Sequence, residues 1–445
     1  MNFPKLLAGI LLLMLIAGVV SGETLSLTLD QAIELGLENS LAVRSKNNAL
    51  QSAQAALAGT KASIYPSLSA SAGWMHLFEQ PESPAIPPLI PAAPAAPQDP
   101  VSVSIDVGQT IYTFGKVSNG LKLAEEAVSS AALDLEEERR ATAVQIKSAF
   151  YGYLLAREVR LINQETLESK REAFEVAQER YSAGVISDFE VLNTESDLES
   201  FKSTVISADN GVRMALLGVK NVLGVDNDIE LELIGELQPI EIRIDREAMI
   251  ALALSRKYDL RSLQKGIEIM EVQRELDLSL RRPTIAGWFN YTLSSGMDAE
   301  GKNDYFTWDS WNHDWTAGVS MDIPISGYFP WSRETADLKR AGIDLEGMRI
   351  AFKSAANGIR LAVESSILKI AEEQAKIDSG GKSVDLAEKL YNSAVDQYDS
   401  GYISSMDLKD TQLALNGARL AYTQAIYSYN INVLELMNAV GVSKL

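Results

Sequence analysis

The residues of this chain that could perform chemistry are few. The 445-residue sequence has no cysteine, which excludes disulfides, thiolate metal sites and cysteine nucleophiles. His76 and His313 are the only histidines, and neither stands at the spacing of a metal ligand or a general base. Paired carboxylates such as Asp407 and Asp410 occur, but no nucleophile or metal-ligating constellation accompanies them. The sequence therefore predicts no enzyme, no catalytic residue, no metal and no cofactor.

A short motif that occurs twice in the sequence is each time followed by a carboxylate. Tyr-x-x-Gly-x-x-Ser stands around Gly184 and again around Gly401, an offset of 401 − 184 = 217 residues. Both glycines are expected in the left-handed conformation that ends a helix, because glycine has no Cβ to clash there. The serine of each motif stands three residues before an acidic residue, Glu190 or Asp407, which is the spacing of a helix N-cap and its N3 residue. Each motif thus predicts a hairpin tip, with the usual capping box at Glu190 and a weaker variant at Asp407.

Proline is missing from two long stretches of the sequence. It is absent between Lys116 and Gly224, and again from Trp331 to the C-terminus. Because proline costs about 3 kcal/mol in a helix interior, such stretches favour long helices. Apolar residues there recur at steps of three and four in both copies. These patterns predict helical hairpins at 117–223 and 332–440, each with a first helix on the order of 95 Å long at 1.5 Å per residue.

Between the helical stretches the apolar pattern changes to period two. The alternation predicts strands at about 67–78 and 101–112, and a second pair at about 284–295 and 314–325. Strands of about ten residues cross an outer membrane when tilted, with an apolar face toward lipid. All six tryptophans lie in or beside these strands, which favours girdles at the membrane interface over a small soluble β-domain with exposed aromatics. They are Trp74, Trp288, Trp308, Trp311, Trp315 and Trp331.

The N-terminus and the charge indicate where the protein works. Residues 1–22 have an early lysine, an apolar run and small residues near Gly22, as in a secretory signal peptide cleaved before Glu23. No cysteine follows the run, so no lipid anchor is expected, and no later stretch reaches eighteen continuous apolar residues, so no transmembrane helix is expected. The formal net charge of −20 argues against nucleic acid as a partner and suits a conduit that favours cations.

The offset of 217 divides the mature chain into two repeats. The first covers 23–239 and the second 240–445, and each contains a helix, a strand pair and a helical hairpin. The pairs that keep the offset include Pro66 with Pro283 and Gly224 with Gly441, and Asp106 with Asp322 is one residue short of it. The sequence therefore predicts a mixed α/β membrane protein built by duplication.

Four strands cannot close a barrel, and an open sheet in lipid would leave unsatisfied edges. Three copies arranged by cyclic symmetry would supply twelve strands and gather the helices into a hollow bundle. The expected assembly is a homotrimer with a twelve-stranded β-barrel and a long α-barrel.

The duplicated strand pairs, the long helices and the two tip motifs resemble the TolC family of outer-membrane efflux and secretion channels. The resemblance covers essentially the whole mature chain. It implies a passive exit duct in the outer membrane, with most of the chain in the periplasm. The tips would dock on a periplasmic adaptor (membrane fusion protein) that connects the duct to an inner-membrane transporter of RND, ABC or MFS type. The sequence does not indicate whether the cargo is a drug, a metal or a protein.

The resemblance also assigns residues to a gate. Counted from the tip glycine, the aspartates that ring the constriction in family members fall on Asp407 and Asp410, and the gate tyrosine falls on Tyr398 with Glu190 as its acidic partner. Asp407 has the alternative explanation of a helix-start residue stabilised by the helix dipole. An arginine that some members carry is replaced by Ile403. The adaptor-docking residues implied are Tyr181, Gly184, Val185, Ile186, Gly401, Tyr402 and Ile403, with the apolar ones expected to be exposed.

The alternative from another class is a soluble periplasmic coiled-coil protein, such as an adaptor, with a small β-domain. Adaptors resemble a single helical hairpin, whereas this sequence has two hairpins and strands of membrane-crossing length.

Overall fold

The computed structural model describes residues 25–78, 99–295 and 308–442. The predicted signal peptide lies outside these residues, as do most of the two segments between paired strands. The described chain forms two compact units. Unit 1 comprises residues up to Asn48, Ala132–Ser262 and residues from Phe352 onward, and unit 2 comprises Ala49–Ala131 and Leu263–Ala351. Among the described helices, none combines the length and the apolar character needed to cross a membrane.

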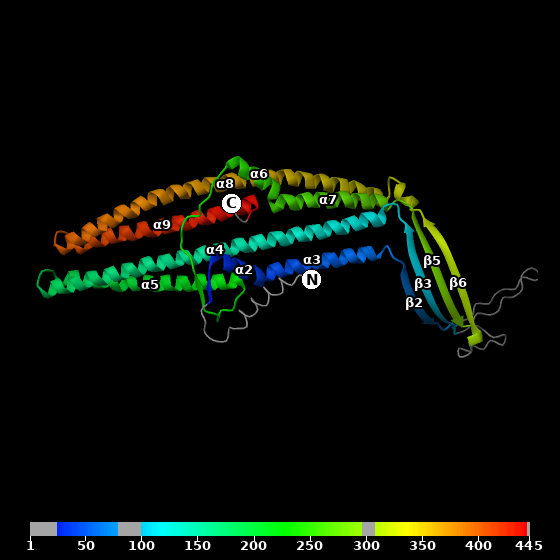
Figure 1. Ribbon diagram of the computed structural model, residues 1–445, viewed down its shortest axis with the longest axis horizontal. Helices are drawn as coiled ribbons and strands as arrows, with labels where there is room; N and C mark the ends of the chain where they lie inside the picture. The colour runs from blue at the N-terminus through cyan, green and yellow to red at the C-terminus, as the bar shows by residue number, and fades with distance from the viewer. Residues whose placement is uncertain (1–24, 79–98, 296–307, 443–445) are drawn as a thin grey trace, which may run out of the picture. The chain divides into compact units, whose positions relative to one another are not determined.

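Two helical hairpins account for about half of the chain (Figure 1). The first consists of α4, Lys116–Ser182, and α5, Asp188–Leu223, and the second of α8, Arg333–Asp399, and α9, Ser405–Val440. The long helices have 67 residues each and the return helices 36 each. Both return helices end at a glycine in the left-handed conformation, with φ of 66° at Gly224 and 79° at Gly441. The absence of proline is what allows helices of this length.

The helix expected before each strand pair is in fact two helices. The first repeat has α2, Leu29–Asn39, and α3, Leu41–Ala62, and the second has α6, Arg246–Arg256, and α7, Tyr258–Ser279. Each pair is interrupted at one residue with non-helical backbone, Ser40 and Lys257. These two residues are 257 − 40 = 217 apart, so the break is itself part of the repeat.

Two short strands lie in unit 1. They are β1, Leu25–Leu27, and β4, Leu231–Leu233, and they pair in parallel.

A four-stranded antiparallel sheet forms part of unit 2. Its order is β2 (Ser67–Trp74), β3 (Val101–Tyr112), β5 (Thr284–Ser295) and β6 (Trp311–Asp322). The β6 strand lies three residues before its predicted position, 314–325, and Pro324, which has no N–H for the ladder, stands just beyond its end. A 3₁₀ turn, η2, occupies Ile325–Tyr328, and another, η1, occupies Trp308–Ser310. The β2 strand ends at Trp74, short of the predicted residue 78.

One face of the sheet carries a chain of polar side chains. Ser104 is 2.9 Å from Ser71 across β2 and β3, and its hydroxyl donates to Asp106 at 3.1 Å. Asn290 on β5 donates to Asp106 at 2.6 Å and accepts from Thr292 at 2.8 Å. The opposite face is apolar and mostly exposed in the single chain. Its residues include Leu68, Trp74, Val103, Ile105, Trp315, Val319 and Met321.

Two sequence expectations about the sheet are wrong. Trp288 pairs with Gly108 and Gly318, which lie on the polar face, so Trp288 does not belong to a lipid-facing girdle. Its ring occupies the space above Gly318, where a Cβ would come within 2.8 Å of it. Asp322 pairs with Thr284, which makes it equivalent to Gly108 in the first repeat. It is therefore not the counterpart of Asp106.

Unit 1 contains two main apolar clusters, one for each repeat. The first-repeat cluster includes Ile146, Leu154, Val219 and Leu223. The second-repeat cluster includes Ile359, Val363, Leu434, Leu436 and Val440. Val144 and Tyr151 of α4 pack against the second-repeat cluster although they belong to the first repeat. The two repeats are therefore joined by direct apolar packing within unit 1.

Candidate functional site

The two hairpin tips, both in unit 1, have the same backbone geometry. Gly184 and Gly401 have φ of 73° and 77°, which is the left-handed region. The residue after each glycine donates its N–H to a carbonyl five positions earlier, Val185 to Arg180 at 2.9 Å and Tyr402 to Gln397 at 2.8 Å. This is the Schellman bond pattern, which satisfies carbonyls at the helix end. The tip motif thus acts through local backbone geometry in both copies.

The caps that start the return helices differ between the tips. Ser404 and Asp407 form a complete capping box: the Asp407 N–H donates to the Ser404 hydroxyl at 3.3 Å, and its carboxylate accepts from the Ser404 N–H at 3.1 Å. Ser187 is the N-cap of α5 but makes no side-chain cap bond. The expectation of the stronger box in the first copy is therefore wrong, because Glu190 is used elsewhere.

The carboxylate of Glu190 accepts a hydrogen bond from the backbone N–H of Ser405 at 3.2 Å. Ser405 is the first residue of α9, so this carboxylate from one hairpin lies at the N-terminus of a helix in the other hairpin. The helix dipole and the unpaired first-turn N–H groups both favour a negative charge at this place. Glu190 therefore connects the two tips within one chain.

Tyr398 is buried between the hairpins rather than free to move. It forms a small cluster with Ala394 and Leu408, and its side chain is only 3% exposed. The Arg180 guanidinium lies 4.4 Å from the centre of its ring. Its hydroxyl is buried and has no hydrogen-bond partner among the described residues, so it does not bond Glu190 here. Burial is the main reason that the pKa of Tyr398 is raised above its usual value.

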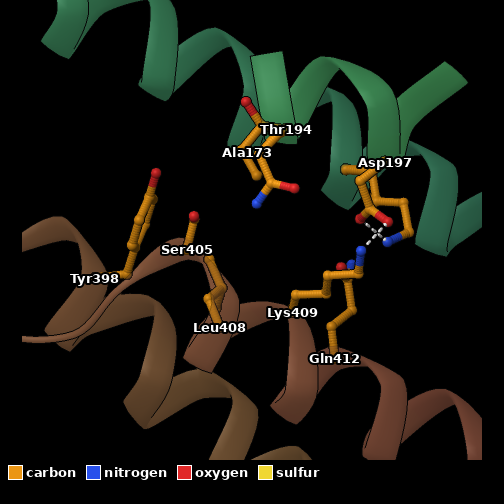
Figure 2. Close-up of a pocket in the computed structure, with 10 residues that line it drawn as sticks. Ala173, Thr194, Asp197, Tyr398, Ser405, Leu408, Lys409 and Gln412 are labelled. Atoms are coloured by element: carbon orange, nitrogen blue, oxygen red, sulfur yellow. Dashed lines mark hydrogen bonds and ion pairs between the residues drawn. The ribbon is translucent and has the colours of Figure 1, made fainter. Parts of the chain in front are cut away.

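A lysine-aspartate-lysine triad joins three helices next to Tyr398 (Figure 2). Asp197 of α5 bonds Lys170 of α4, and it accepts a second bond from Lys409 of α9 at 2.8 Å. Burial alone would raise the pKa of Asp197, but the hydrogen bonds from Lys170 and Lys409 outweigh it and hold that pKa below its usual value. The triad lines a cavity of about 30 Å³ together with Tyr398.

Sequence reasoning missed this triad because its members are far apart in the chain. A signal was nonetheless present in the repeat. The positions offset by 217 from Lys170, Asp197 and Lys409 are all apolar; they are Ala387, Ala414 and Leu192. A charged residue that departs from its repeat counterpart in this way indicates a contact made by only one of the two copies.

Further polar contacts join the two hairpins of the chain. Arg180 is 3.5 Å from Asp399, and the Thr166 hydroxyl donates to Asn416 at 2.9 Å. Arg419 of α9 binds Glu165 of α4 at 2.9 Å and Glu388 of α8 at 3.0 Å. The hairpins are thus fastened to each other from the tip upward by side-chain contacts.

The remaining predicted residues differ in exposure. Asp407 and Asp410 are both exposed and lie three residues apart on α9, so they share a face. The bonds from Ser404 lower the pKa of Asp407, whereas the carboxylate of Asp410 makes no hydrogen bond or ion pair with the described part of the chain.

Of the docking residues, Tyr181, Val185 and Tyr402 are exposed, the last by 83%. Gly184 and Gly401 are exposed as well. Ile186 and Ile403 are half-buried rather than exposed, and Ile403 packs against the Tyr398 cluster.

A model of the outer membrane efflux protein family matches residues 32–225 and 249–442. This chain belongs to the outer membrane efflux protein family. The two matched stretches start 249 − 32 = 217 residues apart, so the unit of the family is the repeat found in the sequence. As a member, the protein is an outer-membrane efflux channel with a periplasmic body, and it is not an enzyme. The soluble adaptor alternative is not favoured.

Relatives of this outer membrane efflux protein have distant sequences. Nodulation protein T of Rhizobium leguminosarum bv. trifolii is 21% identical over 331 residues, covering 74% of this chain and 69% of that protein. Outer membrane protein TolC of Escherichia coli K12 is 20% identical over 350 residues, covering 76% and 69%. The crystal structure of the Campylobacter jejuni CmeC outer membrane channel has the same fold, with a TM-score of 0.76 at 16% identity over 93% of this chain and 85% of that one.

Proposed function

We propose that three copies of this efflux protein form the exit duct of a tripartite efflux or type I secretion system. The duct conducts substrates passively from a periplasmic adaptor and an inner-membrane transporter to the exterior. Its twelve-stranded barrel sits in outer-membrane lipid, and its hairpins form a periplasmic α-barrel that closes at the tips.

The main support for this proposal is the difference between the two faces of the four-stranded sheet. One face bears the hydrogen-bonded polar chain centred on Asp106, and the other bears the exposed apolar residues. Polar residues toward a lumen and apolar residues toward lipid are the pattern of a membrane barrel. Within the described residues, β2 and β6 each pair on one side only. Such edges are costly in lipid, so another copy must cover them.

The repeat sets the register between copies. Asp106 of β3 pairs with Asn290 of β5. In β6, the residue equivalent to Asp106 is Ser320, because Asp322 is equivalent to Gly108. In β2, the residue equivalent to Asn290 is Gly73, since 290 − 217 = 73. Ser320 of one copy therefore pairs with Gly73 of the next, and both face the lumen.

The tips supply the gate and the docking surface. The contacts of Glu190 with Ser405 and of Asp197 with Lys409 hold the two hairpins of each chain together. Around the axis, Asp407 and Asp410 from three copies would concentrate six carboxylates that attract cations. Exposed Tyr402 and its neighbours at the tips fit apolar docking by an adaptor.

Conductance in planar bilayers tests both the proposed channel and the proposed ring of Asp407 and Asp410 side chains. We expect small cation-selective steps from the purified mature protein, blocked by a multivalent cation. The Asp407→Asn plus Asp410→Asn variant should lose the block. The Asp378→Asn plus Asp385→Asn variant removes the same charge from exposed sites on α8 and should keep it. No channels from folded protein would refute the duct, and a block that survives in the first variant would refute the ring.

Cysteine cross-linking tests how the barrel closes. Because the natural chain has no cysteine, Gly73→Cys with Ser320→Cys provides the only thiols. We expect covalent products between copies. Ala72→Cys with Ser320→Cys should give none, since a shift of one residue moves a side chain to the other face of a sheet. Equal products from both pairs would refute the register.

A further inference from the structure

The polar face of the four-stranded sheet carries one large aromatic side chain, Trp288. Among the described strand residues, it is the only aromatic one on that face. Its neighbours in the adjacent strands are two glycines, Gly108 and Gly318. The ring covers Gly318, where a Cβ would lie 2.8 Å from it, and Trp288 is nonetheless 45% exposed. The ring therefore rests on the sheet with much of its surface open.

The first repeat has a different pair of residues at the same place. Subtracting 217 from Trp288 gives Ser71, and Ser71 pairs with Ser104 across β2 and β3 as Trp288 pairs with Gly318 across β5 and β6. The two serine hydroxyls are 2.9 Å apart, which is a common cross-strand hydrogen bond. This place in the sheet is thus filled by two serines in one repeat, so the sheet itself does not require the tryptophan and its glycine.

A carboxylate lies diagonally across from the ring. Asp106 on β3 pairs with Asn290, which is two residues from Trp288 on β5. Diagonal neighbours on one face of a sheet are ~7–8 Å apart, within reach of long and aromatic side chains. Hydrogen bonds from Asn290 and Ser104 hold the carboxylate on the polar face. An open ring beside a negative charge favours a flat aromatic cation, because the ring stacks on flat groups and its π-system attracts positive charge.

We infer that Trp288 and Asp106 form a binding site for flat aromatic cations on the wall of the channel lumen. The inference rests on the proposed trimer, whose lumen the polar face lines. Three copies related by cyclic symmetry place three such rings at one level of the barrel. A duct must release what it binds, and one exposed ring with one carboxylate provides only brief contacts. The site therefore delays aromatic cations during their passage without trapping them.

Single-channel recording with ethidium, a flat aromatic cation, tests the site in the full-length trimer. The variant carries Trp288→Ser with Gly318→Ser, which gives the second repeat the serine pair already present in the first. We expect ethidium to interrupt the wild-type current. The interruptions should be about fivefold shorter in the variant, the factor expected for loss of one cation–π contact at an exposed site.

Three single substitutions complete the test. Trp288→Leu removes the ring but keeps an apolar side chain over Gly318, and it should shorten the interruptions as much as the serine pair does. Asp106→Asn should shorten them by about twofold, since it removes one charge at the diagonal distance. The matched control is Trp315→Leu. Trp315 lies on the apolar face of β6, where it pairs with Tyr291, so the interruptions should keep their wild-type length.

The possible results separate this site from the duct. Channels that ethidium does not interrupt, or interruptions of equal length in wild type and both Trp288 variants, would overturn the site and leave the duct intact. Trp288 would then serve only to cover Gly318. Folded trimers that form no channels would overturn the duct and the site together.

Discussion

Replacing Asp197 by alanine should loosen the tip of the chain. Among the described residues, the carboxylate of Asp197 is the only acceptor for the ammonium group of Lys170, whose side chain is only 10% exposed. Removing one partner of a buried pair costs 3 to 5 kcal/mol, because the other charge is left uncompensated. We expect about 3 kcal/mol here, the low end of that range, because Asp197 is 21% exposed and Lys170 keeps its contact with the ring of Phe201.

Hydrogen exchange followed by mass spectrometry measures this effect locally. A loss of about 3 kcal/mol in the free energy of local opening corresponds to roughly 150-fold faster exchange of amides in the last turns of α4 and the first turns of α5. The control is Glu199→Ala, which removes a carboxylate two residues away that pairs with Lys202 at the surface. Exposed pairs contribute little, so its exchange should change by about twofold at most.

The pH dependence has a defined sign. Because the pKa of Asp197 is lowered in the folded chain, its stabilising contribution is complete above the ordinary carboxyl pKa of about 4 and is lost as the pH falls through the lowered value. The difference between wild type and Asp197→Ala should therefore be constant near neutral pH and shrink in acid. Equal exchange in Asp197→Ala and Glu199→Ala at neutral pH would refute the reasoning.

Three other substitutions, two of them with a matched control, separate further contributions to stability in and near the tips. Ser404→Ala should cost about 1 kcal/mol and speed exchange in the first turn of α9, whereas Ser187→Ala should leave α5 unchanged because it makes no cap bond. Gly401→Ala should lower the thermal unfolding temperature, at a cost of about 1 kcal/mol for the left-handed backbone, while Gly417→Ala in the interior of α9 should raise it. Lys409→Met removes only the outer lysine of the triad. It should lower the free energy of local opening, measured by hydrogen exchange, by about 1 kcal/mol, which is less than the loss expected from removing Asp197.

The sequence predicts the helices well because their ends depend on local signals. A glycine stands at each tip and after each return helix, and the hairpins end within a residue of the predicted positions. Strand ends are less well predicted because alternation does not mark where pairing stops. The β6 strand starts at Trp311, in a stretch that reads as loop, because that residue pairs with Ser295.

The sequence predicts only those features of the candidate site that depend on residues close together in the chain. The Ser404 capping box follows from spacing along one helix. The burial of Ile403 depends on packing between α8 and α9, and the role of Glu190 depends on the other hairpin, neither of which a pattern within a single helix reveals. Trp288 shows the same limit in the sheet, since composition alone does not say which face a tryptophan occupies.

The equal lengths of the helices restrict how this gene can change. Deleting one residue from α4 would turn everything beyond it by about 100° and move the tip by about 1.5 Å, so the faces below the deletion would no longer meet α5 or α9. The same residue count in α4 and α8, and in α5 and α9, means that a tolerated change of length must occur in all four helices together. Insertions and deletions within the hairpins should therefore be inherited as matched sets, whereas point substitutions can accumulate one at a time.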